Sequence, residues 1–352
     1  MKTTLIQNKP NPFRLIRVDI MVGIAMIFIV LSQNIHDFAP QWYAIGIFQW
    51  MNRFCMEVFL FLMAFLMRHN YKRLNSVKDH LSYIGQNFSK IFIPFLLVGV
   101  ALASASAWSL GIEKRDALNY VLTEIRTLLL YPFNSQAWFL GFLYILFGLS
   151  VFSPIVFRLP SWLKMGLCIL SIGLPLLVSS QLLGGNIFCQ YSFFYFLGIL
   201  CAEGSEQLRE LKTWMIGLAS IPFLLWSIRF ISASLQNQAE ATFLEVGPQD
   251  FNILAGCFAL AMLYFLSRII EKSQWASRAL GHIANDWFWI FLLEMFIDLA
   301  CSSAWSWAKL DTVLPFFIFW IIEALLCIII PIGLAELSRK TITQRKPKLK
   351  KK

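Results

Sequence analysis

Residues 17–36 read RVDIMVGIAMIFIVLSQNIH, and this stretch decides the fold. It is apolar apart from Asp19 near its start, and it ends in three polar residues, Gln33, Asn34 and His36. A helix rises about 1.5 Å per residue, so about twenty such residues cross the ~30 Å hydrocarbon core of a bilayer. The stretch predicts a membrane span with an acid at one interface and polar side chains at the other.

The composition of the whole chain extends this prediction. Of its 352 residues, 58% are hydrophobic and only 14% are charged, and the mean hydropathy is positive. A water-soluble protein could not cover so much apolar surface. The first span runs into its polar end without a small-residue cleavage site, so we expect it to be retained rather than removed as a signal peptide. The predicted fold class is an all-α polytopic membrane protein.

Nine further apolar runs of about span length follow the first. The ten expected transmembrane helices cover roughly residues 17–36, 43–67, 91–110, 137–157, 163–181, 187–203, 213–232, 250–268, 287–307 and 313–337. With the N-terminus inside, most of the 30 basic residues fall in cytosolic segments. The positive-inside rule therefore predicts a multi-pass protein of the inner (plasma) membrane with both termini in the cytosol.

The segments outside the spans support a simple domain organisation. We expect one transmembrane domain over residues 1–340 and a polybasic cytosolic tail over residues 341–352. Basic residues near anionic headgroups contribute about 1 kcal/mol each, so the tail is expected to lie along membrane lipids. The net charge of +10 reflects the tail and the orientation bias and does not indicate a nucleic-acid partner. The outer segment 111–136 has apolar residues at helical spacing, which predicts an interfacial helix.

The seven cysteines lie within or beside apolar runs and have no paired spacing. Neither a disulfide framework nor a metal site is predicted, and we interpret most of them as small apolar packing residues.

The spacing D-x-x-x-G-I-A-x-I-x-I-V-L from Asp19 resembles the first span of the acyltransferase 3 family of integral membrane O-acyltransferases. In that family a basic residue follows the acid by three positions and a catalytic histidine follows it by fourteen. Here those positions hold Val22 and Gln33. The apolar spacing resembles that of the family, whereas Val22 and Gln33 differ from the residues that carry the family's chemistry.

Later segments resemble the family in the same order. Residues 54–66, FCMEVFLFLMAFL, match F-H-M-P-L-F-F-F-I-S-G-F-L with Cys55 for His and Glu57 for Pro. The basic segment that ends in KIFIPF resembles the family's basic loop, but Gln86 and Ser89 stand in place of arginines and Lys90 remains.

Three further segments complete the resemblance. Residues 136–140, QAWFL, resemble the start of the family's fourth span, and residues 195–198, YFLG, resemble its sixth. Residues 281–296 resemble its ninth span, in which Glu294 stands where many members have histidine. The resemblance implies that an acyl group is transferred from acyl-CoA, with acetyl-CoA the expected donor. The acceptor it implies is a hydroxyl of a cell-surface glycan or a lipid-linked sugar.

Acyl transfer to a hydroxyl needs a base for the proton and hydrogen-bond donors for the developing oxyanion. Gln33 does not titrate, but it can orient a substrate or donate to the oxyanion. The candidate bases are His36, one helical turn further on, and the intramembrane acids Glu57 and Glu294, because a carboxylate is a stronger base when buried. An interfacial histidine bound to water and a structural ion cluster are the alternative interpretations.

Four residues are candidates for binding substrates: Asp19, Arg53, Trp138 and Lys90. Asp19 matches the family's acid but also suits a helix N-terminus. Arg53 lies four residues before Glu57, so the two are expected on one helix face, where they could pair. Trp138 could line an acceptor groove or belong to the interfacial aromatic belt, and Lys90 could meet phosphates of acyl-CoA or simply mark a cytosolic loop.

Two other functions stay open at this stage. A catalytically inactive relative would bind or translocate a glycan or lipid with the same cavity. A proton-coupled transporter is the other alternative, because Glu57, Glu294, Asp298 and Glu323 lie within expected spans, where acids normally face a polar interior.

Overall fold

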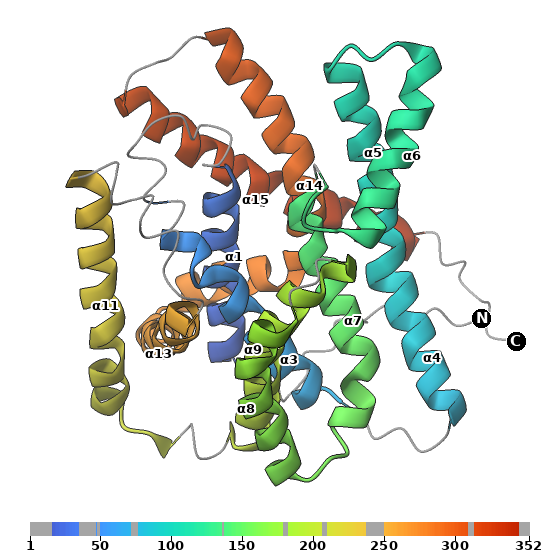
Figure 1. The fold of residues 1–352 in the computed structure, drawn as a ribbon. Helices are drawn as coiled ribbons and strands as arrows, with labels where there is room; N and C mark the ends of the chain where they lie inside the picture. Colours follow the sequence, from blue (N-terminus) through green and yellow to red (C-terminus); the bar gives the residue numbers. More distant parts are fainter. Residues whose placement is uncertain are drawn as a thin grey trace, which may run out of the picture. The chain divides into compact units, whose positions relative to one another are not determined.

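The computed structural model describes residues 16–34, 47, 50–71, 77–135, 137–178, 182–205, 210–236, 250–308 and 313–344. Regular structure in these ranges is entirely helical, and eight helices are long and apolar enough to cross a membrane (Figure 1). The predicted all-α polytopic fold class is confirmed. The fifth expected span is a shorter apolar helix, Ser161–Leu174. The ninth lies in α14 (Gln274–Ala308), where acids interrupt the apolar sequence.

The chain divides into two compact units that interleave in the sequence. Unit 1 consists of Met1–Asn52, Lys212–Glu294 and Cys301–Lys352, and unit 2 of Arg53–Leu211 and Met295–Ala300. Unit 1 contains α1 (Ile16–Asn34), α11 (Thr213–Gln236), α13 (Asp250–Ile270), most of α14 and α15 (Val313–Gln344). Unit 2 contains α3 (Cys55–His69), α4 (Val77–Asn87), η1 (Phe88–Phe92), α5 (Ile93–Ser109), α6 (Lys114–Leu130), η2 (Trp138–Leu140), α7 (Gly141–Val156), α8 (Ser161–Leu177), η3 (Leu182–Gly184) and α9 (Gly185–Glu203).

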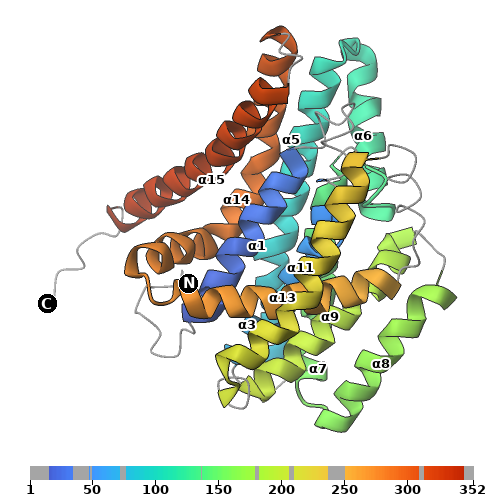
Figure 2. The same ribbon diagram turned by 90° about the vertical axis from the view of Figure 1, so that its left-hand side faces the viewer.

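In unit 1, α1 packs against two of the other helices, α13 and α15 (Figure 1). It is apolar on every side, as expected of a buried helix. A Cβ atom on Gly23 would lie 2.5 Å from the carbonyl oxygen of Leu280, so the backbones of α1 and α14 nearly touch there. Only glycine allows this approach. Helix α11 packs on α13 and crosses it steeply (Figure 2).

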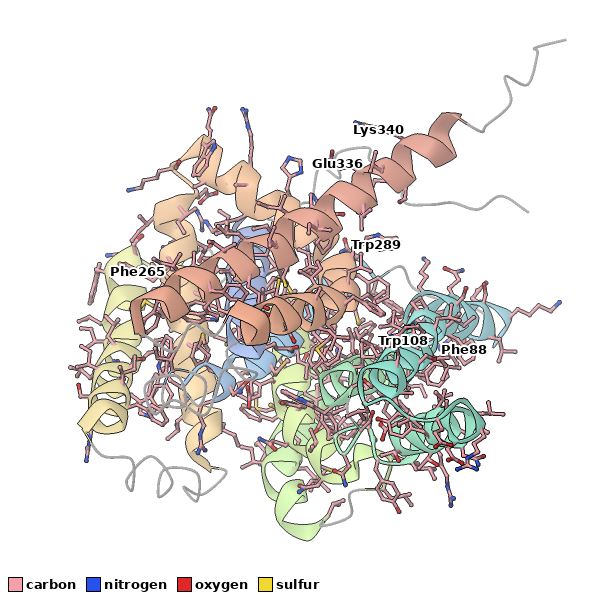
Figure 3. The ribbon with its side chains drawn as sticks, turned by 90° about the horizontal axis from the view of Figure 1, so that it is seen from above. Phe88, Trp108, Phe265, Trp289, Glu336 and Lys340 are labelled. Carbon is pink, nitrogen blue, oxygen red and sulfur yellow. The ribbon has the colours of Figure 1, made fainter. Side chains whose placement is uncertain are left out.

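Two ion pairs hold helix ends of unit 1 together. Arg17 Nε donates to Glu271 Oε2 at 2.6 Å, which joins α1 to the end of α13. Arg339 of α15 pairs with Asp286 of α14, whose side chain is 1% exposed. Helix α15 has 32 residues and is therefore about 48 Å long, more than the hydrocarbon core requires. Glu336 and Lys340 lie on its last turns, near the point where the chain leaves the helix (Figure 3).

In unit 2, α9 packs against both α3 and α8. The close contact of α3 and α9 is at Gly198, where an added Cβ would overlap the carbonyl oxygen of Phe61. Glu203, at the end of α9, accepts a hydrogen bond from Arg68 Nε at 2.8 Å and also pairs with Lys164. One carboxylate thus joins the ends of α3, α8 and α9.

A π turn connects α4 to α5, and the sequence explains its position. Pro94 lies in the first turn of α5, and in a regular helix its ring would clash with the carbonyl of Lys90, four residues earlier. The π turn, residues 88–92, includes that carbonyl, and Phe88 and Phe92 stack there at 5.0 Å. Pro94 therefore lies where the π turn passes into α5.

The segment expected to form an interfacial helix is helical over most of its length. Residues 114–130 form α6, which packs on α5. Leu128 is buried against this neighbour, with its side chain beside Gly99, whereas Leu118 and Leu122 are exposed. The spacing of apolar residues therefore predicted the helix correctly.

Candidate functional site

The C-terminal end of α1 meets α14 and α15 at a polar junction, which we define as Gln33, Asn34, Glu294 and Cys327. The Asn34 side-chain amide is satisfied when its nitrogen, and not its oxygen, faces the neighbouring acceptor atoms. In this orientation Nδ2 donates to Glu294 Oε1 at 3.3 Å and to the carbonyl of Val30 at 3.1 Å. The Cys327 thiol lies 3.6 Å from the Asn34 amide and donates to the carbonyl of Glu294 at 3.8 Å. Asn34, Glu294 and Cys327 are all fully buried, so these contacts form away from water.

Two further features of α15 shape this junction. Trp320 Nε1 donates to the carbonyl of Leu31 at 2.9 Å and so fastens the end of α1 to α15. Pro331 follows Cys327 by four residues and cannot donate the backbone hydrogen bond that the Cys327 carbonyl would accept in a regular helix. Glu323, which is 1% exposed, precedes Cys327 by one turn and shares its face of α15. Polar groups are therefore concentrated where three apolar helices meet.

Gln33 is the polar group of the junction whose amide is unused within the protein. Its side chain is 6% exposed, and neither Nε2 nor Oε1 has a hydrogen-bond partner among the residues that the structure describes. A buried amide atom without a partner costs about 1–3 kcal/mol. This is the position at which the resemblance places the family's histidine. The amide can donate a hydrogen bond to a ligand, but it cannot take up a proton.

Glu294 is the residue of the junction that can take up a proton. Its carboxylate is held by the Asn34 amide and is 0% exposed. A general base must be held in the right orientation and must also be basic enough to accept a proton. The hydrogen bond from Asn34 meets the first requirement, because it fixes the orientation of the Glu294 carboxylate. The junction thus contains a buried carboxylate on α14 and, one residue before its partner Asn34 on α1, a buried amide without a partner among the described residues.

A second polar cluster lies in unit 2 and consists of Arg53, Cys55, Glu57 and Tyr191. We expected Arg53 and Glu57 on one helix face, but α3 begins at Cys55, so Arg53 lies in the turn before the helix. Phe54 has φ −145° and ψ −19°, outside the helical region, so the regular helix is interrupted between residue 52 and Cys55. Arg53 and Glu57 nevertheless interact electrostatically.

The structure places the other predicted site residues as follows. Asp19 is half-buried in the first turn of α1. Trp138 is half-buried in η2, and Lys90 is exposed on the π turn. His36 lies outside the described residues, so its role as a base stays a prediction. Of the predicted residues, Gln33 and Glu294 belong to unit 1, where Asn34, the chain neighbour of Gln33, bonds Glu294. Arg53, Glu57, Trp138 and Lys90 belong to unit 2.

Sequence reasoning gave no role to Asn34, Cys327 or Trp320. Asn34 stands out in the sequence as a polar residue at the end of the first span, but its partner is about 260 residues away. Cys327 and Trp320 look like ordinary apolar residues of the last span. In the described part of the chain, no three His, Cys, Asp or Glu side chains are grouped to hold a metal ion.

Comparison with known proteins identifies the family to which the chain belongs. A family model described as an acyltransferase domain, acyltransferase 3, matches residues 15–336. No curated protein and no solved structure matches the chain. The matched region includes α1, the polar junction and the Glu57 cluster, and it covers nearly all of the sequence. The chain therefore belongs to the acyltransferase 3 family of membrane acyltransferases.

Proposed function

We propose that this protein transfers an acyl group, most simply acetyl, from acyl-CoA to a hydroxyl of a cell-surface glycan or glycolipid. Membership of the acyltransferase family supports the reaction type. The observation that carries the assignment to a site is the buried Glu294 carboxylate, held by Asn34, whose chain neighbour Gln33 has a buried amide without a partner among the described residues. The junction offers both a base and an oxyanion donor although the expected histidine is replaced.

The proposed reaction assigns a step to each group. The acceptor hydroxyl gives its proton to the Glu294 carboxylate, and its oxygen attacks the carbonyl carbon of the thioester. The carbonyl oxygen becomes an oxyanion, to which Gln33 Nε2 donates. The carbon–sulfur bond then breaks, and the CoA thiolate takes the proton back from Glu294. Asn34 acts as a positioning residue that aims the carboxylate.

The proposal includes the setting of the reaction. Acyl-CoA is charged and water-soluble, so it would approach from the cytosol, and the glycan acceptor would approach from the outer side. The bias of Lys and Arg toward one side of the spans supports an inner-membrane protein with cytosolic termini. Membrane lipids are the expected surroundings, and no nucleic-acid partner is proposed.

A second candidate function follows from Gln33 itself. Because an amide stands where the family has its catalytic histidine, the protein could be an inactive relative that binds or translocates a glycan or lipid. The buried acids Glu294 and Glu323 would alternatively serve proton-coupled transport, since acids inside a membrane commonly handle protons. These alternatives differ from the first in needing no acyl donor.

The test uses the full-length protein in lipid nanodiscs with acetyl-CoA. Donor binding and the release of CoA thiol are followed in the wild type, Glu294→Gln and Gln33→Leu. Removal of a base costs about 10²–10⁴-fold in rate, and removal of one oxyanion donor about 10²–10³-fold. Glu113→Gln is the control, because Glu113 is exposed and lies far along the chain from the junction.

The outcomes separate the candidates. Release of CoA that depends on Glu294 and Gln33 but not on Glu113 supports the acyltransferase. Binding of acetyl-CoA without release supports an inactive relative. If the protein does not bind acetyl-CoA and liposomes containing it take up protons with a solute, transport replaces the proposal.

A further inference from the structure

A group of charged and aromatic side chains joins three helix ends of unit 1, at the opposite end of α1 from the polar junction. Arg17, in the first turn of α1, donates through Nε to Glu271 Oε2, just after the end of α13, at 2.6 Å. Arg268, in the last turn of α13, donates through Nη1 to Thr213 Oγ1, the first residue of α11, at 3.1 Å. The starts of α1 and α11 and the end of α13 therefore lie together. With Tyr264 of α13, we define these four residues as the arginine cluster.

Tyr264 holds both guanidinium groups of the cluster. Its phenol is hydrogen-bonded to Arg17, and the guanidinium carbon of Arg268 lies 5.2 Å from the centre of its ring. Each arginine is thus held at two points, Arg17 by Glu271 and Tyr264, and Arg268 by Thr213 and Tyr264. A side chain that is already held in place loses less conformational entropy when it binds a ligand. The two guanidinium groups are therefore oriented before a ligand binds.

The charges of the cluster favour an anion. Lys212 and Lys272 are exposed and are chain neighbours of the cluster, so two arginines and two lysines outnumber Asp19 and Glu271 at these helix ends. The cluster is open to solvent, because 31% of the Arg17 side chain and 34% of the Glu271 side chain are exposed. A guanidinium has five N–H donors in a planar fork that matches the oxygens of a phosphate. Phosphate is therefore the anion that suits two oriented arginines.

Exposed tryptophans indicate the depth of the cluster in the membrane. Trp214 follows Thr213 on α11 and is 61% exposed, and Trp275 lies at the start of α14 and is 80% exposed. Tryptophan is enriched at the boundary between membrane and water, at the level of the lipid headgroups. Basic pockets between transmembrane helices bind anionic headgroups at this level. The phosphate within reach of such a cluster is that of a lipid.

We infer that the arginine cluster binds the headgroup of an anionic phospholipid, with the phosphate held between Arg17 and Arg268. The phosphate oxygens accept hydrogen bonds from both guanidinium groups, and the neighbouring lysines favour a headgroup without a cation of its own. This site differs from the general attraction of a polybasic segment to membranes, because it depends on the orientation of two side chains. It needs neither the acyl donor nor the chemistry of the polar junction, so it can be tested apart from the proposed function.

The test counts the lipids that the full-length protein retains. The protein is purified in a non-ionic detergent and titrated with phosphatidylglycerol or with phosphatidylcholine, and native mass spectrometry measures the fraction that carries one lipid. Phosphatidylcholine has the same phosphate together with a choline cation, which the lysines repel. The cluster variants are Arg17→Gln, Arg268→Gln and Tyr264→Phe. Arg278→Gln is the matched control, because Arg278 is an exposed arginine of unit 1 outside the cluster.

We expect the wild type to retain phosphatidylglycerol in preference to phosphatidylcholine. Loss of a hydrogen bond to a charged group weakens binding about tenfold or more, so Arg17→Gln and Arg268→Gln should lower the affinity for phosphatidylglycerol by that factor. Arg278→Gln should leave the affinity unchanged. Tyr264→Phe keeps every charge and should still weaken binding, because Arg17 loses the phenol that orients it. This variant tests the inference even if Arg17→Gln does not fold.

Equal retention of the two lipids by the wild type overturns the inference. An equal loss in Arg278→Gln and Arg268→Gln also overturns it, because positive charge alone would then account for the binding. Coenzyme A without an acyl group tests the other source of phosphate. If coenzyme A binds through Arg17 and Arg268 and phosphatidylglycerol is not preferred, the cluster is a donor site and not a lipid site. Retention of phosphatidylglycerol that coenzyme A does not alter supports the lipid site.

Discussion

Replacement of Gly23 by alanine tests the geometry on which the polar junction depends. The new methyl carbon would lie 2.5 Å from the carbonyl oxygen of Leu280 and 3.0 Å from its carbonyl carbon and Cα. All three are backbone atoms, which cannot rotate away as the end of a flexible side chain could. An ordinary contact begins at 3.4 Å, so α1 and α14 would have to part by about 0.9 Å.

The energetic balance gives the sign and size of the effect. Alanine is favoured over glycine in a helix by about 1 kcal/mol. Forcing an extra carbon into a closely packed interface costs about 1–3 kcal/mol. Because the contacts are with rigid backbone atoms, we expect the upper part of this cost and a net loss of stability of up to about 2 kcal/mol. The Asn34–Glu294 hydrogen bond has a length of 3.3 Å, so a separation of this size should break it and lower CoA release as well.

Gly281→Ala is the matched control, since Gly281 follows Leu280 on α14 and a Cβ there meets no atom within 4 Å. Thermal unfolding of both variants is compared with the wild type in the same nanodiscs, and CoA release is measured in parallel. Gly281→Ala should equal or exceed the wild type in stability. If Gly23→Ala is as stable and as active as Gly281→Ala, the close approach of the helices does not exist and the argument for the junction fails.

The remaining predictions test other contacts. Gly198→Ala should lower the unfolding temperature, because its methyl group meets the Phe61 backbone, whereas Gly166→Ala, whose methyl group meets nothing within 4 Å, should not. Glu203→Gln leaves the buried Lys164 ammonium without its carboxylate and should lower the free energy of unfolding by about 3 kcal/mol in denaturant titrations. The same replacement of an exposed acid should change the free energy of unfolding by no more than the experimental error. Asn34→Leu removes the amide that orients the Glu294 carboxylate and should slow CoA release about tenfold or more; an unchanged rate would exclude a positioning role for Asn34.

The sequence predicted the helices well because each span depends on local composition. Apolar runs of the right length predicted the fold class, and the helical spacing of apolar residues predicted α6. The break before Cys55 was missed, since nothing in the residues around Arg53 interrupts the apolar pattern. There the backbone conformation of Phe54, and not residue preference, decides where the helix begins.

The candidate site was predicted only in part, because it is built from distant contacts. Gln33 and Glu294 were identified separately, one from its place in the family's motif and the other as an acid at depth. The contact of Asn34, the neighbour of Gln33, with Glu294 depends on how α1 packs against α14, which Gly23 permits and no residue of the site encodes. Asn34 and Cys327 acquire their importance solely from the partners they meet in three dimensions.

The interleaving of the two units determines the order in which they can be completed during synthesis. Unit 2 draws nearly all of its helices from one continuous stretch, residues 53–211, and can assemble as that stretch emerges. Helix α1 is made first but needs α13, α14 and α15, and at about 5–20 residues per second the last of these follows roughly 15–60 s later. Until α14 has been made, the polar C-terminal end of α1 lacks its hydrogen-bonding partner Glu294. Truncation of α15 should therefore leave unit 2 assembled and the nascent junction exposed to membrane quality-control proteases.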